Sequence, residues 1–230
     1  MQLIGKDQEG YYGISGDYMQ VLTLYLDGVE SRKVLAESGT MVYFKGDVKM
    51  EKNVLESSGS FDRHVFSTFE KIVKHEKIAF TSYSGSGEVG FSNILPGMIQ
   101  PVKLDGTSLI IAKDSLMAAI GTVDISVLMQ QGVGSIFFGG EGLVLTSVKG
   151  GGDVFISGGG TIISYKLAGG ESIRVEGGSA IAWDSSVTHK VEREAKLKSA
   201  LFGDESLFIN TFTGPGTVLV QTITLSKLKG

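Results

Sequence analysis

Apolar and polar residues alternate along most of this 230-residue chain, in runs that glycine interrupts. A period of two places successive side chains on opposite faces of an extended strand, so each run predicts a β-strand. The glycines lie at the ends of the runs, where they supply the backbone conformations of turns and bulges. The pattern predicts an all-β protein, built as a sandwich or a β-helical stack.

One arrangement of strands occurs three times along the chain. Glycine-rich tripeptides occupy residues 85–87, 150–152 and 214–216, and alternating runs flank each of them. A fixed period of this size is typical of one supersecondary unit that buries its apolar face against its neighbours. We therefore expect a single domain, residues 1–230, with pseudo-threefold internal repeats. The repeats cover about residues 20–92, 98–157 and 161–225.

Each tripeptide is expected to form the turn of a β-hairpin. The windows 76–92, 141–157 and 205–221 carry apolar side chains at matching alternate positions, so the three hairpins should superpose. Each window opens with a glutamate, and three carboxylates gathered on one axis would repel one another or recruit a cation. The favoured alternative is that each glutamate binds backbone N–H groups of its own loop. The three glutamates are Glu76, Glu141 and Glu205.

The first repeat contains an insertion with a different period. Phe61, Val65, Phe69 and Ile72 follow one another at the spacing of an amphipathic helix. The insertion therefore predicts one short helix over residues 61–74, which covers an open end of the β-structure. The alternative is a helix that binds a partner, because an exposed apolar face often marks an interface.

Composition narrows the class of protein. The chain is 42% hydrophobic, enough for a substantial core, and its net charge of −4 exerts no long-range attraction on nucleic acid. It has no cysteine, which excludes disulfides and thiolate metal sites. No apolar run reaches the ~20 residues of a membrane helix, and the first residues do not form a signal peptide. We expect a cytoplasmic protein without a membrane span.

Three segments of the chain resemble a known family. They are Ala36–Tyr43, Phe138–Leu143 and, as the most specific part, Leu201–Gly216. The chain resembles the "altered inheritance of mitochondria" family from about Val21 to Leu225, nearly its whole length. The resemblance implies a fold like that of the tryptophan RNA-binding attenuation protein, a β-rich relative of double-stranded β-helices. It implies no established enzyme activity. Eukaryotic members are linked to the mitochondrial inner membrane, but no transit peptide supports that role here.

The motifs for nucleotide chemistry and nucleophilic catalysis are weak or missing. Gly85–Gly90 fits the pattern G-x-G-x-x-G, but dinucleotide binding needs a helix after the glycines and here a strand follows. No serine stands in a G-x-S-x-G elbow. The neighbourhood of His189 and Asp184 is the one place to look for a nucleophile and its base, and ordinary loop polarity explains it more simply.

Metal and nucleic-acid sites are also disfavoured. The histidines His64, His75 and His189 never form an H-x-H pair, so we expect them to lie apart and hold no common metal. His189 and Glu192 are three residues apart in a predicted strand, which directs their side chains to opposite faces. Nucleic acid would require a basic stripe with aromatic residues. The clearest basic cluster is Lys71, Lys74 and Lys77.

The sequence therefore predicts a non-enzymatic scaffold or protein-interaction module that self-associates or binds a protein partner. We expect no catalytic residue, cofactor or metal. One alternative is a module that binds a small ligand or RNA, reminiscent of the attenuation protein. The least favoured alternative is a cupin-like metal enzyme, which would need histidines that converge.

Overall fold

The computed structural model describes residues 3–6, 10–29, 33–56, 77–130, 143–194, 207–225 and 227. Strands account for most of these residues, which confirms the all-β prediction. The predicted helix at residues 61–74 lies outside the described residues. The strands are β1 (Leu3–Lys6), β2 (Tyr12–Ser15), β3 (Val21–Asp27), β4 (Val34–Glu37), β5 (Met41–Glu56), β6 (Lys77–Ser92), β7 (Gly97–Ala112), β8 (Leu116–Gln130), β9 (Leu143–Leu167), β10 (Ser172–Glu176), β11 (Ala180–Asp184), β12 (Thr188–Glu194), β13 (Leu207–Thr213) and β14 (Gly216–Ile223).

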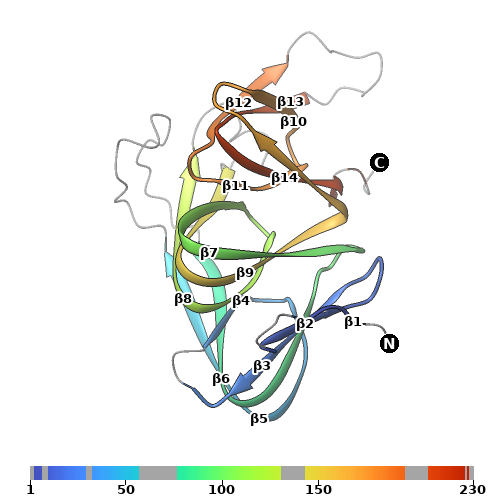
Figure 1. Cartoon of the computed structure of the whole chain (residues 1–230), viewed down its shortest axis with the longest axis vertical. Helices are drawn as coiled ribbons and strands as arrows, with labels where there is room; N and C mark the ends of the chain where they lie inside the picture. The colour runs from blue at the N-terminus through green and yellow to red at the C-terminus, as the bar shows by residue number, and fades with distance from the viewer. Residues whose placement is uncertain are drawn as a thin grey trace.

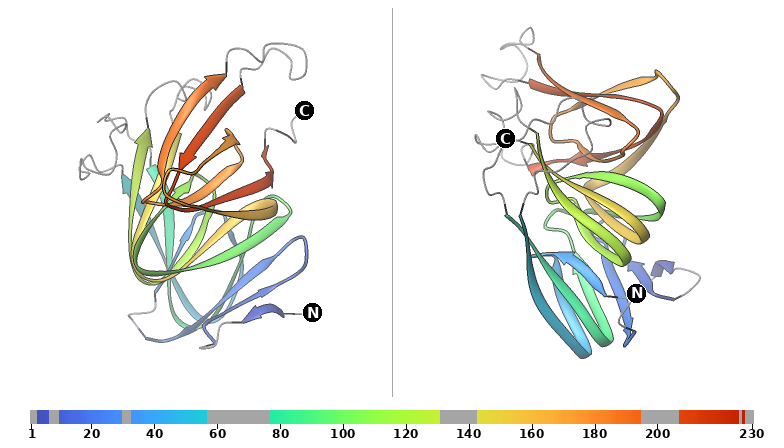
Figure 2. Two further views of the ribbon diagram at one scale, coloured as in Figure 1. Left: turned by 45° about the horizontal axis from the view of Figure 1, so that its top comes forward. Right: turned by 90° about the vertical axis from the view of Figure 1, so that its left-hand side faces the viewer.

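The strands form one large antiparallel sheet and one small one. The large sheet has eleven strands, with the path β1-β2-β3-β6-β4-β8-β9-β14-β11-β7 and β5 paired to β6. The small sheet has the order β10-β13-β12. The molecule is elongated, with β3–β6 at one end, β7–β9 in the middle and β10–β14 at the other end (Figures 1 and 2).

The glycine tripeptides do not form hairpin turns, so the hairpin prediction is wrong. Strand β6 runs through residues 85–87 and β9 through residues 150–152 without a break. At residues 214–216 the chain passes from β13 to β14, which belong to different sheets. Gly85 and Gly150 have φ angles of 106° and 125°, and a Cβ at either would overlap a carbonyl oxygen of the facing strand. The glycines therefore let a long strand bend instead of reversing it.

The same strand pairings surround each bend. We define unit 1 as residues 21–92, unit 2 as residues 97–158 and unit 3 as residues 159–223. In each unit the segment after the bend lies between two partner strands, and one partner carries a bulge. These triplets of strands are β3-β6-β5 in unit 1, β7-β9-β8 in unit 2 and β9-β14-β11 in unit 3.

Neighbouring units join through backbone pairing and shared cores. Strand β4 of unit 1 pairs with β8 of unit 2, and β7 of unit 2 pairs with β11 of unit 3. Buried apolar clusters cross both junctions, and one of them combines Leu22 and Phe91 of unit 1 with Phe155 of unit 2. Backbone pairing and shared cores therefore link each unit to the next along the molecule, while β10, β13 and β12 form their own small sheet.

Candidate functional site

His189 on β12 is a partly buried polar residue enclosed by aromatic rings and one amide. Its ring stacks on that of Phe212, with a centroid distance of 4.7 Å and an interplanar angle of 13°. The ring centroid of Trp183 also lies 4.7 Å from that of His189, at a tilted angle. Its Nε2 atom lies 2.8 Å from Oδ1 of Asn210. Because Nδ2 of Asn210 donates to the carbonyl of Gly177, Oδ1 must accept, so Nε2 of His189 carries the proton.

The His189 ring is held in its neutral form. Burial lowers the pKa of His189, while the hydrogen bond to Asn210 opposes that shift. The remaining ring nitrogen, Nδ1, is buried without a hydrogen-bond partner. Aromatic packing and a single amide explain this arrangement as part of the core of unit 3. Asp184, from the same neighbourhood, accepts a hydrogen bond from the backbone N–H of Thr217 at 2.7 Å and so fixes the start of β14.

A second partly buried polar residue, Glu37, lies where units 1 and 2 meet. It ends β4 and lies beside Asp114 in the turn between β7 and β8. Burial and the nearby Asp114 carboxylate raise the pKa of Glu37 to about 7, while Lys113 and the backbone N–H of Asp114 act in the opposite direction. Sequence reasoning missed this contact because the two acidic residues belong to different units and no local motif links them.

The start of strand β5 exposes a run of apolar side chains. Met41, Val42, Tyr43 and Phe44 follow one another, and their side chains are 37%, 59%, 37% and 46% exposed. In the described part of the chain β5 pairs with β6 alone, so its other edge offers unpaired backbone groups. The Tyr43 ring covers Gly90 and its hydroxyl lies 3.1 Å from Oγ1 of Thr23. These contacts hold the apolar strand in an ordered position.

A family model described as "Mitochondrial biogenesis AIM24" matches residues 12–223. The chain belongs to this family. The resemblance noted in the sequence is therefore confirmed. A crystal structure of a protein from Streptococcus pyogenes is similar over 95% of this chain and 96% of that one, with a TM-score of 0.70 and 18% identity. That likeness shows a shared fold. No curated protein sequence matches the chain significantly.

In this AIM24 family member, most of the residues singled out from sequence do not meet at one site. His64, His75, Lys71, Lys74 and the three glutamates lie outside the described residues. His189 and Glu192 lie on β12 at a spacing that places them on opposite faces. Among the described residues, no three histidine or acidic side chains could hold a metal together. The same residues contain no helix long and apolar enough to cross a membrane.

The apolar start of β5 could have been noticed in the sequence. Met41–Phe44 is a run of four apolar residues without alternation, which is typical of a strand buried on both faces. Nothing in the run itself indicates that these four side chains are exposed. Residues 116–119 at the start of β8 and 180–183 in β11 are also apolar.

Proposed function

We propose that this AIM24 family member is a non-enzymatic scaffold or protein-interaction module that binds protein through strand β5. The observation that carries the proposal is the exposure of Met41–Phe44 on an edge strand. A contiguous apolar patch on a protein surface marks an interaction site. An open strand edge adds backbone hydrogen bonds, so a partner can extend the sheet there.

We further propose that the chain is three copies of one β-unit, stacked as in the tryptophan RNA-binding attenuation protein and double-stranded β-helices. Support comes from the recurrence of the same three-stranded arrangement and the same bulge in units 1, 2 and 3. In stacked repeats each unit buries its faces against its neighbours, and the terminal units have one face without a neighbour. Strand β5 lies on such a terminal face.

The polar groups support a non-catalytic role. Nucleophilic or acid–base catalysis needs two or more side chains within hydrogen-bond reach of one reacting atom. The two described side chains whose pKa shifts affect acid–base behaviour near neutrality are Glu37 and His189, which lie in different units. Each has a structural explanation, an inter-unit contact for Glu37 and an aromatic core for His189.

Native mass spectrometry of the full chain purified from its own host tests this proposal. We expect masses above the 24.4 kDa of one chain, from self-association or from a protein partner. Hydrogen–deuterium exchange should show slower exchange of the β5 amides in the complex than in the dissociated chain. A chain that stays at its own mass and whose β5 amides exchange equally with and without host extract would overturn the proposal.

A further inference from the structure

Strands β5, β8 and β11 occupy the same place in the three units. Each pairs with the segment after the glycine bend, and each carries its bulge at the same point, between Met41 and Tyr43, Leu116 and Ala118, and Ala180 and Ala182. The bulges align Met41–Phe44 with residues 116–119 and 180–183. All three segments consist of apolar residues.

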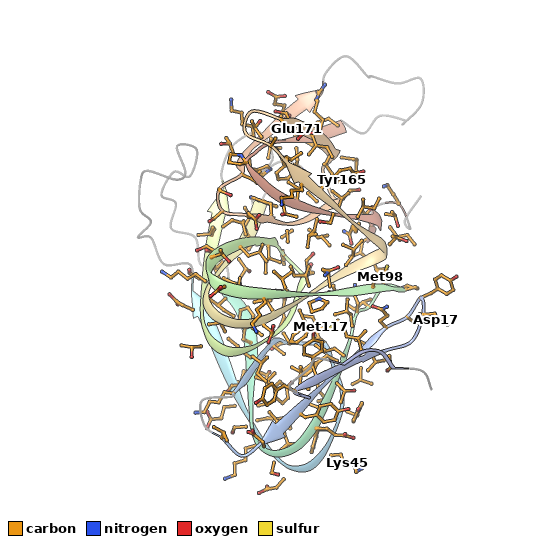
Figure 3. The ribbon with its side chains drawn as sticks, viewed as in Figure 1. Asp17, Lys45, Met98, Met117, Tyr165 and Glu171 are labelled. Atoms are coloured by element: carbon orange, nitrogen blue, oxygen red, sulfur yellow. The ribbon has the colours of Figure 1, made fainter. Side chains whose placement is uncertain are left out.

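Only the first of these segments is exposed. The side chains of residues 116–119 and 180–183 are between 0% and 7% exposed, against at least 37% for Met41–Phe44. The contrast is greatest at the bulged residue, where Met117 and Ile181 are completely buried and Val42 is 59% exposed. Met117 lies inside the molecule, at the level where units 1 and 2 meet (Figure 3).

A strand of the preceding unit covers the two buried segments. Strand β4 pairs with β8 and β7 pairs with β11, both antiparallel. The two junctions have the same register when the units are aligned by their bulges. The directly opposite residues are Val34 and Ile120, Leu35 and Ala119, Ala36 and Ala118 at the first junction, and Leu109 and Asp184, Ile110 and Trp183, Ile111 and Ala182 at the second.

Strand β10 is the counterpart of β4 and β7 in unit 3. Each of the three pairs with the segment that precedes the glycine bend, namely β6, β9 and β13. In the described part of the chain β10 has β13 as its one partner and forms the edge of the small sheet. Lys45 beside the exposed segment and Glu171 beside β10 lie at opposite ends of the long axis (Figure 3). The molecule thus carries one half of the repeated junction at each end.

We propose that the partner of the β5 surface is a second copy of this chain, whose β10 pairs antiparallel with β5. This inference rests on the proposed interaction function and names its partner. The register of the two internal junctions places Ile173 opposite Lys45, Arg174 opposite Phe44 and Val175 opposite Tyr43. Because the two surfaces differ, the contact is head-to-tail and generates a closed ring or an open filament.

The substitution Val42→Asp tests the interface. Val42 is exposed in the single chain, so the variant should fold, but a carboxylate there would be buried at the proposed junction. We expect sedimentation velocity of the wild type to show mass that rises with concentration, and the variant to stay at 24.4 kDa. Ile94→Asp is the matched control, since Ile94 is 85% exposed in the connection between β6 and β7, and it should assemble like the wild type.

Engineered cysteines test the register. The chain has no cysteine. When the Phe44→Cys variant is mixed with the Arg174→Cys variant, the introduced cysteines are therefore the only thiols in the sample. Directly opposite residues of an antiparallel pair are close enough for a disulfide. We expect a cross-linked dimer under oxidation. Lys190→Cys is the control for Arg174→Cys, because Lys190 lies two strands away on β12 and should not cross-link to position 44.

The outcomes separate this inference from the proposed function. Loss of assembly in Val42→Asp together with a cross-link at Arg174→Cys but not Lys190→Cys supports the head-to-tail junction. An assembly that survives Val42→Asp, or a complex in which a different protein covers β5, overturns the junction and leaves the interaction module intact. A wild-type chain that stays monomeric at every concentration and binds no protein overturns both.

Discussion

At the scale of single residues, surrounding groups explain the two pKa shifts that matter near neutral pH, those of Glu37 and His189. His189 is enclosed by Phe212 and Trp183, and Glu37 lies against a second carboxyl group from the next unit. In both cases the folded state favours the uncharged form. Both residues therefore make the stability of the protein depend on pH, and they do so in opposite directions.

Glu37 should destabilise the fold above neutral pH. Its pKa is about 7 in the folded protein against an ordinary value of 4.5, so its contribution to stability is complete below pH 4.5 and is lost as the pH rises through 7. At pH 8 we expect Glu37→Gln to raise the free energy of unfolding by up to about 3 kcal/mol. Urea denaturation at pH 5 and pH 8 measures this difference.

Asp114→Asn is the matched control for Glu37→Gln. It removes the neighbouring charge but keeps a residue that tolerates the φ of 65° at this position. It should lower the pKa of Glu37 and stabilise the protein at pH 8 to a smaller degree, because burial is the larger cause of the shift. Equal stability of both variants and the wild type at pH 8 would contradict the proposed origin of the pKa.

His189 should destabilise the fold in acid. Its pKa is below the ordinary 6.5, so its contribution is complete above pH 6.5 and is lost as the pH falls through the lowered value. His189→Phe should remove this part of the pH dependence. It should also cost about 1–3 kcal/mol at pH 7, because the amide oxygen of Asn210 loses its donor. Fluorescence of Trp183, the only tryptophan, reports both effects. An unchanged acid dependence in the variant would refute this account.

At the scale of elements, the decisive feature is the glycine bend in a long strand. Strand β9 continues for 25 residues, and its first part pairs with the end of β8 while its later part pairs with β14. Gly121 of β8 and Gly152 of β9 face each other at the bend, as Gly46 and Gly87 do in unit 1. Paired glycines allow both strands to turn together, so the ladder of hydrogen bonds continues around the corner.

Substituting alanine for two neighbouring glycines in this bend should change the stability of the protein by different amounts. A Cβ on Gly150 would overlap the carbonyl of Thr122, and the φ of 125° there is unfavourable for alanine. A Cβ on Gly151 meets nothing within 4 Å. We expect Gly150→Ala to cost at least about 1–3 kcal/mol and Gly151→Ala less than about 0.5 kcal/mol, measured by denaturant unfolding. Similar losses in the two variants would argue against the bend.

At the scale of the whole molecule, one continuous sheet connects all three units. The junctions β4–β8 and β7–β11 and the apolar clusters around them make each unit depend on the next. Phe155 illustrates this dependence, since it belongs to unit 2, is fully buried and has its ring centroid 4.8 Å from that of Tyr12 near the start of the chain.

Phe155→Ala should therefore destabilise the whole chain. We expect a loss of about 3–5 kcal/mol, the usual range for removing a buried phenylalanine. The fluorescence of Trp183 in unit 3 and the amide protection of β3 in unit 1 should be lost in the same denaturant transition. Two separate transitions would show that the units unfold independently, as loosely coupled repeats do.

The sequence by itself determined the all-β class, the alternating runs that lie in the strands, the positions of the glycines and the family. These properties are local, because alternation with a period of two and the backbone freedom of glycine act within a few residues. The apolar character shared by residues 41–44, 116–119 and 180–183 was also visible in the sequence. The division into repeats at residues 20–92, 98–157 and 161–225 remains a prediction.

Only the tertiary structure decided how these elements are used. Whether a glycine tripeptide reverses a strand or bends it depends on the partner strands on both sides, and those come from distant parts of the sequence. The contact of Glu37 with Asp114 likewise joins different units. Met41–Phe44 and its two counterparts are alike as sequence, yet the structure leaves only Met41–Phe44 exposed. The physical reason is position along the molecule, because β4 and β7 pair with β8 and β11, whereas β5 has β6 as its one partner among the described residues.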